Sequence, residues 1–340
     1  MFDKIFQEIK DVFYKERKEE LDVALEYFET MFDYTVFNGK QNRAKAVVEA
    51  YKILTKCNEN TDMKLAYVIG CCIEIIQASF LIHDDIMDKA QFRRNKRCWH
   101  LISQDKGYGL IAINDGLHLN TIIHRILKHY FKNMPYYIDL IELFNDTIYY
   151  TCSGQCLDML TSSENLDWNN FTEIRYEAIV KNKTAYYSFN LPVASALILA
   201  GEKDEIIFEK AKKILCKIGE YYQIQDDYLD FYGNVETIGK IGRDIEEGKC
   251  SWLVIQALNL ATDSQISKLR ENYGKQDSEN VEVVRNLYKE LRLDEVFLEY
   301  EKETYKKLME MIDSIEIDYA TKLPKEIFIN LLHHIYKRKK

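Results

Sequence analysis

The sequence is poor in the residues that break helices. Its 340 residues include only 13 glycines and 3 prolines, well below the average usage of about 7% and 5%. Both residues destabilise helix interiors, and no stretch alternates apolar and polar residues as a half-buried strand would. Hydrophobic residues make up 47% of the chain, enough to fill a sizeable core. These features predict long helices joined by few turns and argue against disorder.

No cysteine pattern indicates a disulfide framework or a zinc site. The eight cysteines are scattered, with no Cys-x-x-Cys pair and no Cys/His zinc spacing. Such usage is typical of reduced thiols in a cytosol-like compartment. The N-terminal segment "MFDKIFQEIK" is charged from its third residue and contains no signal-peptide core. We therefore expect a cytoplasmic protein.

Acidic residues outnumber basic ones, with 55 Asp and Glu against 46 Lys and Arg. The formal net charge of −9 argues against nucleic acid as a partner, because phosphate backbones attract basic surfaces. One apolar run, "LAYVIGCCIEIIQASFLI" at 65–82, has the length of a membrane span, but it contains Glu74 and Gln77. A charged residue near a bilayer centre costs about 2.5–3.5 kcal/mol. We expect a buried core helix there and no transmembrane segment.

Apolar residues recur with the helical period along almost the whole chain. The expected helices are 3–33, 41–57, 63–91, 109–133, 136–160, 170–188, 191–200, 204–232, 250–260, 264–272, 278–290, 293–313 and 324–337. No Ser-, Pro- or Gly-rich linker divides the chain. The pattern predicts a single all-α domain over residues 1–340, built as a helical bundle.

Two acidic motifs of the form Asp-Asp-x-x-Asp each close a long apolar segment. They are "IHDDIMDKA" at 82–90 and "IQDDYLDFY" at 224–232. On a helix, Asp84 and Asp88 stand on one face, where like charges repel each other. A solvated acidic surface would be the simpler interpretation of one such motif. Two copies against apolar segments favour carboxylates gathered to bind cations.

Helical carboxylates of this kind favour magnesium over calcium. A calcium cage takes six to eight oxygens, and the EF-hand supplies them from a loop with a turn glycine, whereas magnesium takes one or two carboxylates and keeps positions for water and phosphate. Basic residues follow each motif, in "QFRRNKR" and in "GKIGRDIEEGK", and guanidinium groups bind phosphate oxygens in pairs. The second segment lacks the Walker pattern, and a charged surface loop is its alternative interpretation. Several magnesium ions bridged by a diphosphate are expected.

These residues resemble a known family. "FLIHDDIMDKAQFRR" and "YYQIQDDYLDFYGNVETIGKIGRDIEEGKCSW" are similar to the two aspartate-rich regions of trans-isoprenyl diphosphate synthases, close to the farnesyl diphosphate synthase branch. The resemblance continues at "FNGKQNRA", "SGQCLDMLT", "KNKTAYYSFNLP" and the terminal "IYKRK", and so spans nearly the whole chain. It implies an all-α bundle around a large central cavity, and a homodimer.

The resemblance also implies the site residues. Three magnesium ions, for which manganese is an expected substitute, would be bound by Asp84, Asp88 and Asp226, with Asp85, Asp227 and Asp230 in support. The allylic diphosphate would be held by Arg93, Lys183, Lys240 and Lys249, with Gln155 and Asp158 orienting it or a metal-bound water. Isopentenyl diphosphate would be bound by Gly39, Lys40, Arg43, Gln77 and Arg94. Thr184 and Gln223 would lie near the developing carbocation.

The implied reaction joins isopentenyl diphosphate to dimethylallyl, geranyl or farnesyl diphosphate by ionisation, condensation and proton loss. The farnesyl branch usually has paired aromatics five and four residues before the first aspartate, where this chain has Ser79 and Phe80. A second aromatic is often found where it has Asn190. Because serine leaves space that a ring would fill, we expect geranylgeranyl diphosphate alongside farnesyl diphosphate.

Two alternatives stay open on sequence alone. A terpene cyclase of the same fold usually replaces the second aspartate motif and has no use for Lys40 and Arg43. A non-catalytic partner subunit of a prenyl synthase loses ligands from at least one motif, whereas this chain keeps all its motif aspartates. The basic C-terminal residues "KRKK" at 337–340 are either a solvated tail or a segment that closes over isopentenyl diphosphate.

Overall fold

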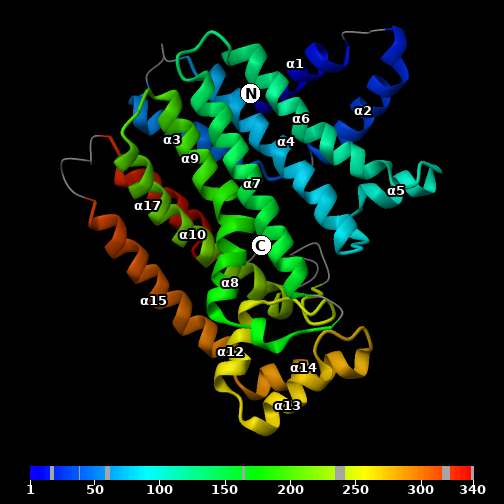
Figure 1. Ribbon diagram of the computed structural model, residues 1–340. Coiled ribbons are helices and arrows are strands. Elements are labelled where there is room, and N and C mark those ends of the chain that lie inside the picture. The colour runs from blue at the N-terminus through cyan, green and yellow to red at the C-terminus, as the bar shows by residue number, and fades with distance from the viewer. Residues whose placement is uncertain are drawn as a thin grey trace. The chain divides into compact units, whose positions relative to one another are not determined.

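The computed structural model describes residues 1–15, 19–37, 39–57, 62–162, 165–233, 242–315 and 322–337. These ranges are helical almost throughout, which confirms the all-α class (Figure 1). The α-helices are α1 (Phe2–Tyr14), α2 (Asp22–Thr35), α3 (Asn42–Thr55), α4 (Lys64–Met87), α5 (Trp99–Asp105), α6 (Ile111–Phe131), α7 (Tyr137–Thr161), α8 (Glu173–Val180), α9 (Leu191–Leu199), α10 (Glu205–Tyr232), α12 (Trp252–Leu260), α13 (Asp263–Asn272), α14 (Ser278–Glu290), α15 (Leu293–Asp313) and α17 (Lys325–Ile335).

Most expected helices lie within a few residues of their predicted bounds, with two exceptions. The predicted helix 3–33 was wrong as one element: it consists of α1, the 3₁₀-helix η1 (Glu19–Leu21) and α2. The predicted helix 170–188 was also wrong as one element. It consists of the 3₁₀-helix η2 (Trp168–Asn170), α8 and the π-helix η3 (Lys181–Asn190), which leads directly into α9.

The chain divides into two compact units. Unit 1 comprises residues 1–146, 190–211 and 321–327, and unit 2 comprises 147–189, 212–320 and 328–340. Each acidic motif belongs to a different unit, the first to unit 1 and the second to unit 2. The single domain over residues 1–340 and its central cavity stay predictions.

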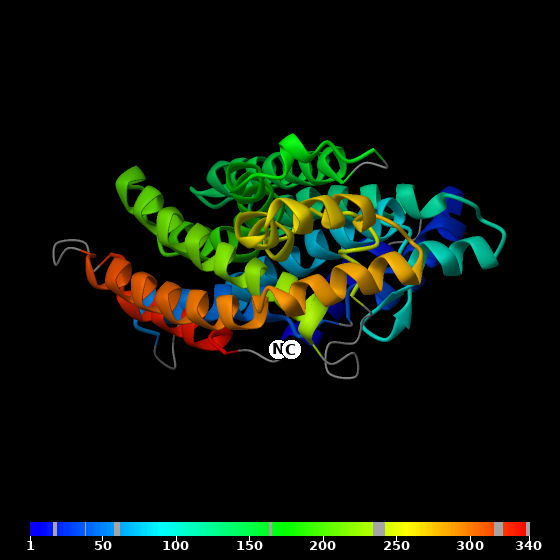
Figure 2. The same ribbon diagram turned by 90° about the horizontal axis from the view of Figure 1, so that it is seen from below.

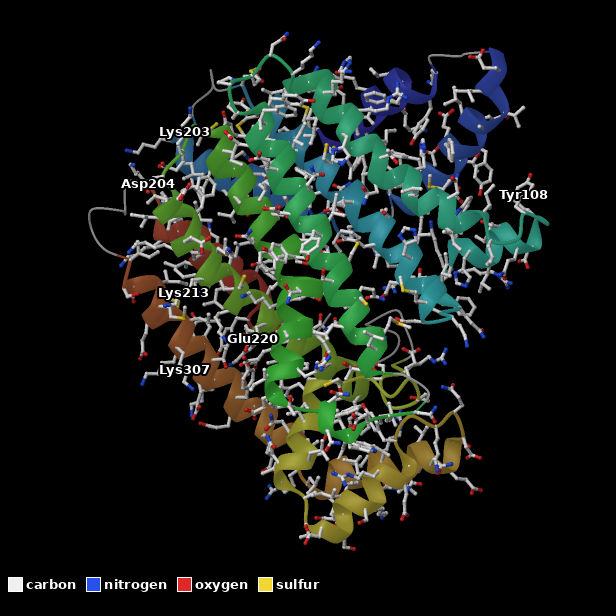
Figure 3. The ribbon with its side chains drawn as sticks, viewed as in Figure 1. Tyr108, Lys203, Asp204, Lys213, Glu220 and Lys307 are labelled. Atoms are coloured by element: carbon white, nitrogen blue, oxygen red, sulfur yellow. The ribbon has the colours of Figure 1, made fainter. Side chains whose placement is uncertain are left out.

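Helix α4 is the centre of unit 1. It packs against α6, α3 and α9, and Gly70 allows close approach, since a Cβ there would lie 2.9 Å from the Phe2 ring and 3.0 Å from the Ala44 carbonyl. By length and composition α4 could cross a membrane, but 78% of its apolar window is buried inside the protein. The run at 65–82 is therefore a core helix, as predicted. Elsewhere in unit 1, Asp204, which is labelled in Figure 3, lies 3.7 Å from Lys322 by its carboxylate.

A short hairpin follows α4 and was not predicted. Its strands β1 (Phe92–Arg93) and β2 (Lys96–Arg97) pair antiparallel, Arg93 opposite Lys96. The two turn residues, Arg94 and Asn95, have φ of 53° and 61°, as a two-residue turn of type I′ requires. The chain turns between α4 and β1, where Lys89 has a φ of 52°, and Arg93 on β1 contacts the first acidic motif.

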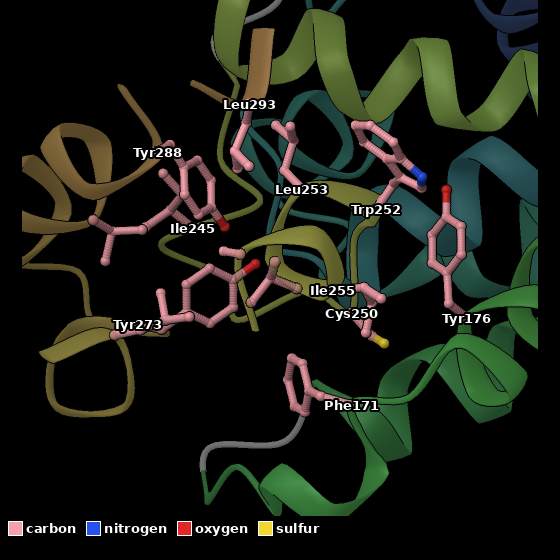
Figure 4. Packing of buried hydrophobic residues seen from close by; sticks show 14 of the residues in the cluster. Phe171, Tyr176, Ile245, Cys250, Trp252, Leu253, Ile255, Tyr273, Tyr288 and Leu293 are labelled. Atoms are coloured by element: carbon pink, nitrogen blue, oxygen red, sulfur yellow. The ribbon is translucent and has the colours of Figure 1, made fainter. Parts of the chain in front are cut away.

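The core of unit 2 is rich in aromatic residues. Trp252, Tyr273 and Tyr288 are almost completely buried with aliphatic residues of α12 and α14 (Figure 4). The Tyr273 hydroxyl donates to the Lys249 carbonyl at 2.7 Å. Helices α13 and α14 pack together (Figure 2). This core therefore holds the segment that carries Lys249 against the rest of unit 2.

Candidate active site

The first acidic motif lies on the last turn of α4, where Arg93 neutralises it. Arg93 Nη2 lies 2.8 Å from Asp84 Oδ2, and Arg93 Nε lies 2.6 Å from Asp85 Oδ1. Asp88 is the C-terminal cap residue of this helix and is half-buried. Its backbone amide donates to the Asp84 carbonyl at 2.9 Å. One guanidinium thus offsets the repulsion between adjacent carboxylates.

Burial affects the two members of this group in different ways. It raises the pKa of Asp85, although the charge of Arg93 and its hydrogen bond act in the opposite direction. Burial alone would lower the pKa of Arg93, but the adjacent Asp85 and Asp84 carboxylates raise it above its ordinary value. Asp85 is buried and bound to Arg93, whereas Asp84 and Asp88 are half-exposed. This agrees with a supporting role for Asp85.

His83, directly before the first motif, and Ser79, about one turn earlier on α4, both contact α6. The Ser79 hydroxyl donates to the Gly116 carbonyl at 2.7 Å, and His83 Nε2 lies 3.2 Å from the Ile113 carbonyl. A Cβ on Gly116 would lie 2.5 Å from His83 Nε2. Any residue with a side chain at this position would therefore clash with the His83 ring. Ser79 is almost completely buried and Phe80 is half-buried.

Most residues expected to bind isopentenyl diphosphate gather between α3, α4 and the hairpin of unit 1. Arg43 Nη1 donates to Gln77 Oε1. Gly39 is so close to the hairpin that a Cβ there would lie 3.2 Å from Arg94 Nη1 and 3.4 Å from Glu74 Oε2. Lys40 is exposed nearby in the chain, and its carbonyl accepts a 2.8 Å hydrogen bond from Lys45. The structure brings Gly39, Arg94 and the Arg43–Gln77 pair together.

Glu74 is a member of this group that the sequence analysis missed. It is buried, and its Oε1 accepts a 3.1 Å hydrogen bond from the Ala44 amide. A lone acid within an apolar run was treated only as evidence against a membrane span. Because a buried carboxylate needs partners, its position one turn before Gln77 could have identified it.

In unit 2, three residues assigned to the allylic diphosphate form one ionic cluster. Asp158 Oδ2 lies 2.7 Å from Lys183 Nζ and 3.2 Å from Lys249 Nζ. Burial raises the pKa of Asp158, but the two lysines outweigh it and lower that pKa overall. Gly154 brings α7 against η3, since a Cβ there would lie 2.2 Å from the Lys183 amide nitrogen. Gln155 is half-buried on the same helix.

A second chain of hydrogen bonds in unit 2 ends at Asp227. The Thr184 hydroxyl donates to Gln223 Oε1 at 2.9 Å, and the Gln223 amide donates to Asp227 Oδ1 at 2.9 Å. The Tyr176 hydroxyl and the Trp252 amide both donate to Asp227 Oδ2 at 2.8 Å. Burial raises the pKa of Asp227 despite these donors. Both Asp227 oxygens therefore have protein partners, which agrees with a supporting role.

Asp226 and Asp230 complete the second motif on α10. Both are half-buried. Asp230 Oδ2 accepts a 3.1 Å hydrogen bond from the Asp244 amide. The chain returns here so closely that a Cβ on Gly242 would lie 1.8 Å from the Asp230 carbonyl. Lys240 lies outside the described residues.

The π-helix η3 carries Lys183 and Thr184 and was not predicted. Such segments are rare and are often found at functional sites. It brings Lys183 to α7 and Thr184 to α10. Asn190, which replaces an aromatic of the farnesyl branch, ends η3 and is buried.

The donor set is suited to a hard cation. Each motif offers carboxylate oxygens, and magnesium prefers oxygen ligands. Within the described ranges, no group of three or more His, Cys, Asp or Glu side chains forms a ready metal cage.

Known proteins share both the sequence and the fold. The sequence profile of polyprenyl synthetases matches residues 25–291. Farnesyl pyrophosphate synthase from Zea mays is 48% identical over 339 residues, covering 96% of this chain and 95% of the relative. The human farnesyl pyrophosphate synthase is 45% identical over 324 residues, covering 94% of this chain and 76% of the relative.

The solved structures agree with the sequence relatives. T. brucei farnesyl diphosphate synthase complexed with risedronate superposes with a TM-score of 0.89 at 33% identity, covering 100% of this chain and 99% of that one. The predicted family, fold and enzyme class are thereby confirmed. The chain belongs to the polyprenyl synthetase family and is a short-chain prenyltransferase.

Proposed function

We propose that this prenyltransferase condenses isopentenyl diphosphate with dimethylallyl, geranyl and farnesyl diphosphates. Farnesyl and geranylgeranyl diphosphate are the products. The observation that carries the proposal is the retention of both complete acidic motifs, each with its partners in place: Arg93 at Asp84 and Asp85, and Gln223 with Tyr176 at Asp227.

The aspartates and cations have separate tasks. Magnesium ions, when bound by Asp84, Asp88 and Asp226, supply positive charge to the departing diphosphate. Asp85, Asp227 and Asp230 hold these ligands in position. We assign three ions to the loaded enzyme, with manganese as a substitute.

Cationic side chains bind the allylic diphosphate. Lys183 and Lys249 are positioned by Asp158 at 2.7 and 3.2 Å, Arg93 by its two aspartates, and Lys240 joins them. Charge-assisted hydrogen bonds to phosphate oxygens are about twice as strong as neutral ones. Gln155 orients the diphosphate, and Thr184, whose hydroxyl donates to Gln223 Oε1 at 2.9 Å, would lie with Gln223 near the developing carbocation. These fixed dipoles stabilise charge that forms only during the reaction.

The residues expected to bind isopentenyl diphosphate distinguish a condensing enzyme from a terpene cyclase and from a non-catalytic subunit. Gly39, Lys40, Arg43, Gln77 and Arg94 would bind isopentenyl diphosphate, and Arg43 is already oriented by Gln77. A cyclase acts on one substrate and needs no such site. A non-catalytic subunit does not need both complete acidic motifs. The gathering of four of these residues in unit 1 therefore favours a condensing enzyme.

The setting of the enzyme is also proposed. We assign it to the cytoplasm and to a homodimer, with no nucleic acid partner. Ser79 in place of an aromatic leaves room for one more isoprene unit, so geranylgeranyl diphosphate is a major product. The basic tail at 338–340 lies outside the described residues, and its closure over isopentenyl diphosphate stays a prediction.

Removal of the metal and of its ligands tests the proposal. Chelation should abolish condensation of geranyl and isopentenyl diphosphates, and added magnesium should restore it. Asp84→Asn and Asp226→Asn should each lower kcat by about a hundredfold or more, the scale of a lost electrostatic contact in a transition state. Asp62→Asn, an exposed aspartate before α4, is the control. Near-normal turnover in both motif variants, with melting curves unchanged, would contradict the assignment.

A further inference from the structure

A groove in unit 1 has cationic residues that the proposed function does not use. It has a volume of about 720 Å³ and lies between the end of α1 and the last turns of α6. Its lining residues are Asp11, Val12, Phe13, Arg125, Lys128, His129 and Lys132. The four basic residues follow at intervals of three, one and three, so they share one face of α6. We call this the α1–α6 groove.

The cations of the groove are exposed and are not neutralised by nearby acids. Within the described ranges, no carboxylate lies within 4.0 Å of Arg125, Lys128 or Lys132. The one acid of the lining, Asp11, lies 2.6 Å from Lys15 and accepts a 2.9 Å hydrogen bond from Gln7. This face is basic although the chain as a whole has a net charge of −9.

An aromatic wall gives the groove an apolar side. The Arg125 guanidinium carbon lies 5.4 Å from the centre of the Phe13 ring, and the His129 ring meets the same ring edge-on at 5.9 Å. The cation–π contact fixes Arg125 while leaving its donors available. The volume lies in the range of small-ligand sites, about 300–1,000 Å³.

The groove is far from the first acidic motif within unit 1. Ile113 and Gly116, at the start of α6, contact His83 and Ser79 near the aspartates. Arg125 to Lys132 follow nine or more residues later on or just after α6. At about 1.5 Å per residue, the two sites are separated by roughly 14–29 Å along the helix. The groove is therefore no part of the site built around Asp84.

Basic residues at a helix C-terminus also have a simpler use, because they stabilise the helix dipole. That use explains neither the cavity beside them nor the alignment of Arg125 on Phe13. We propose that the α1–α6 groove binds a phosphate-bearing ligand, with Arg125, Lys128 and Lys132 on the phosphate and Phe13 beside its apolar part. The phosphate can belong to a soluble phosphate compound or to a lipid headgroup.

Binding measurements on a matched pair of variants test this proposal. Calorimetry in magnesium-free, low-salt buffer would measure inorganic phosphate and diphosphate binding to the whole chain, and co-sedimentation would measure binding to phosphatidylserine vesicles. The groove variant is Lys128→Ala/Lys132→Ala. The control is Lys302→Ala/Lys306→Ala, two exposed lysines with the same spacing on α15.

The groove variant should lose one class of phosphate or vesicle sites, or bind at that class at least tenfold more weakly, while the control behaves as wild type. The kcat and KM of the groove variant for condensation should equal those of the wild type. Loss of vesicle binding alone identifies a lipid headgroup, and loss of phosphate binding alone identifies a soluble ligand. If the folded groove variant binds both probes as the wild type does, the proposal is wrong.

Discussion

Single site residues in this protein are held by partners that also shift their pKa. Arg93 is shared by Asp84 and Asp85, and Asp158 is shared by Lys183 and Lys249. Buried charges are costly unless paired, and these two groups each have opposite charges beside them. A ligand that binds such a group meets side chains whose orientation is already fixed.

At the residue scale, Arg43 offers a selective test of the isopentenyl diphosphate site. Arg43→Ala should raise the KM for isopentenyl diphosphate about tenfold to a hundredfold, because a hydrogen bond to a charged group contributes roughly 1.5–3 kcal/mol. The KM for geranyl diphosphate should change little. Steady-state kinetics with each substrate varied in turn would measure both values. Lys52→Ala, exposed on the same helix, is the control, and an unchanged KM for isopentenyl diphosphate in Arg43→Ala would exclude this site.

His118 makes the stability of the chain depend on pH. Burial, with a smaller effect of Arg125, lowers its pKa to about 4, while an unfolded histidine titrates near 6.5. The ring stacks on Phe28 at 3.7 Å and lies 3.1 Å from the Tyr14 hydroxyl. Between these pH values the unfolded chain binds more protons than the folded one. The free energy of unfolding should therefore fall as pH decreases from about 6.5 to about 4.

Replacing the ring measures this contribution. His118→Phe should remove about 1–2 kcal/mol of the acid-induced decrease in the free energy of unfolding. This value is reduced for the partial exposure of the ring. Urea unfolding at pH 7 and pH 5 would give the difference for each protein. The same pH dependence in His118→Phe and in the wild type would show that other groups cause the loss.

At the scale of elements, the sequence predicted the regular helices except α5, and it missed the irregular segments. The bounds of α14 and α15 match because their apolar positions keep one period throughout. The hairpin was missed because its turn places Arg94 at a positive φ, a conformation that arginine rarely adopts. The π-helix was missed because its residues keep a helical pattern, and only tertiary contacts such as Gly154 against Lys183 distinguish it.

The α4–α6 contact at Ser79 leads to a prediction about product length. Ser79→Phe should make farnesyl diphosphate the end product, because a ring there occupies the space proposed for a further isoprene unit. Ser79→Ala, which removes the hydroxyl but adds no volume, should leave the products unchanged. Phe80→Ala should allow longer chains. Mass analysis of the products would show the shift, and identical products from Ser79→Phe, Phe80→Ala and wild type would place the length limit elsewhere.

At the scale of the whole molecule, the hydrogen bonds and ion pairs among the predicted site residues were not predictable from the sequence. The motifs identified Asp227 and Lys183, whereas their partners Tyr176 and Asp158 lie 51 and 25 residues away. Sequence spacing carries no information about such long-range pairs. The partner of Glu74, a backbone amide on another helix, was equally unpredictable, although its place one turn before Gln77 could have identified the residue itself.

The stoichiometry of the reaction tests the central claim most directly. Purified chain with magnesium, geranyl diphosphate and isopentenyl diphosphate should release one diphosphate for each isopentenyl diphosphate consumed. Diphosphate release and labelled isopentenyl diphosphate uptake would be followed in the same reaction. We predict a one-to-one ratio and no release above background when isopentenyl diphosphate is omitted. Release without uptake of isopentenyl diphosphate would identify a cyclase or hydrolase, and no turnover by folded chain would identify a non-catalytic subunit.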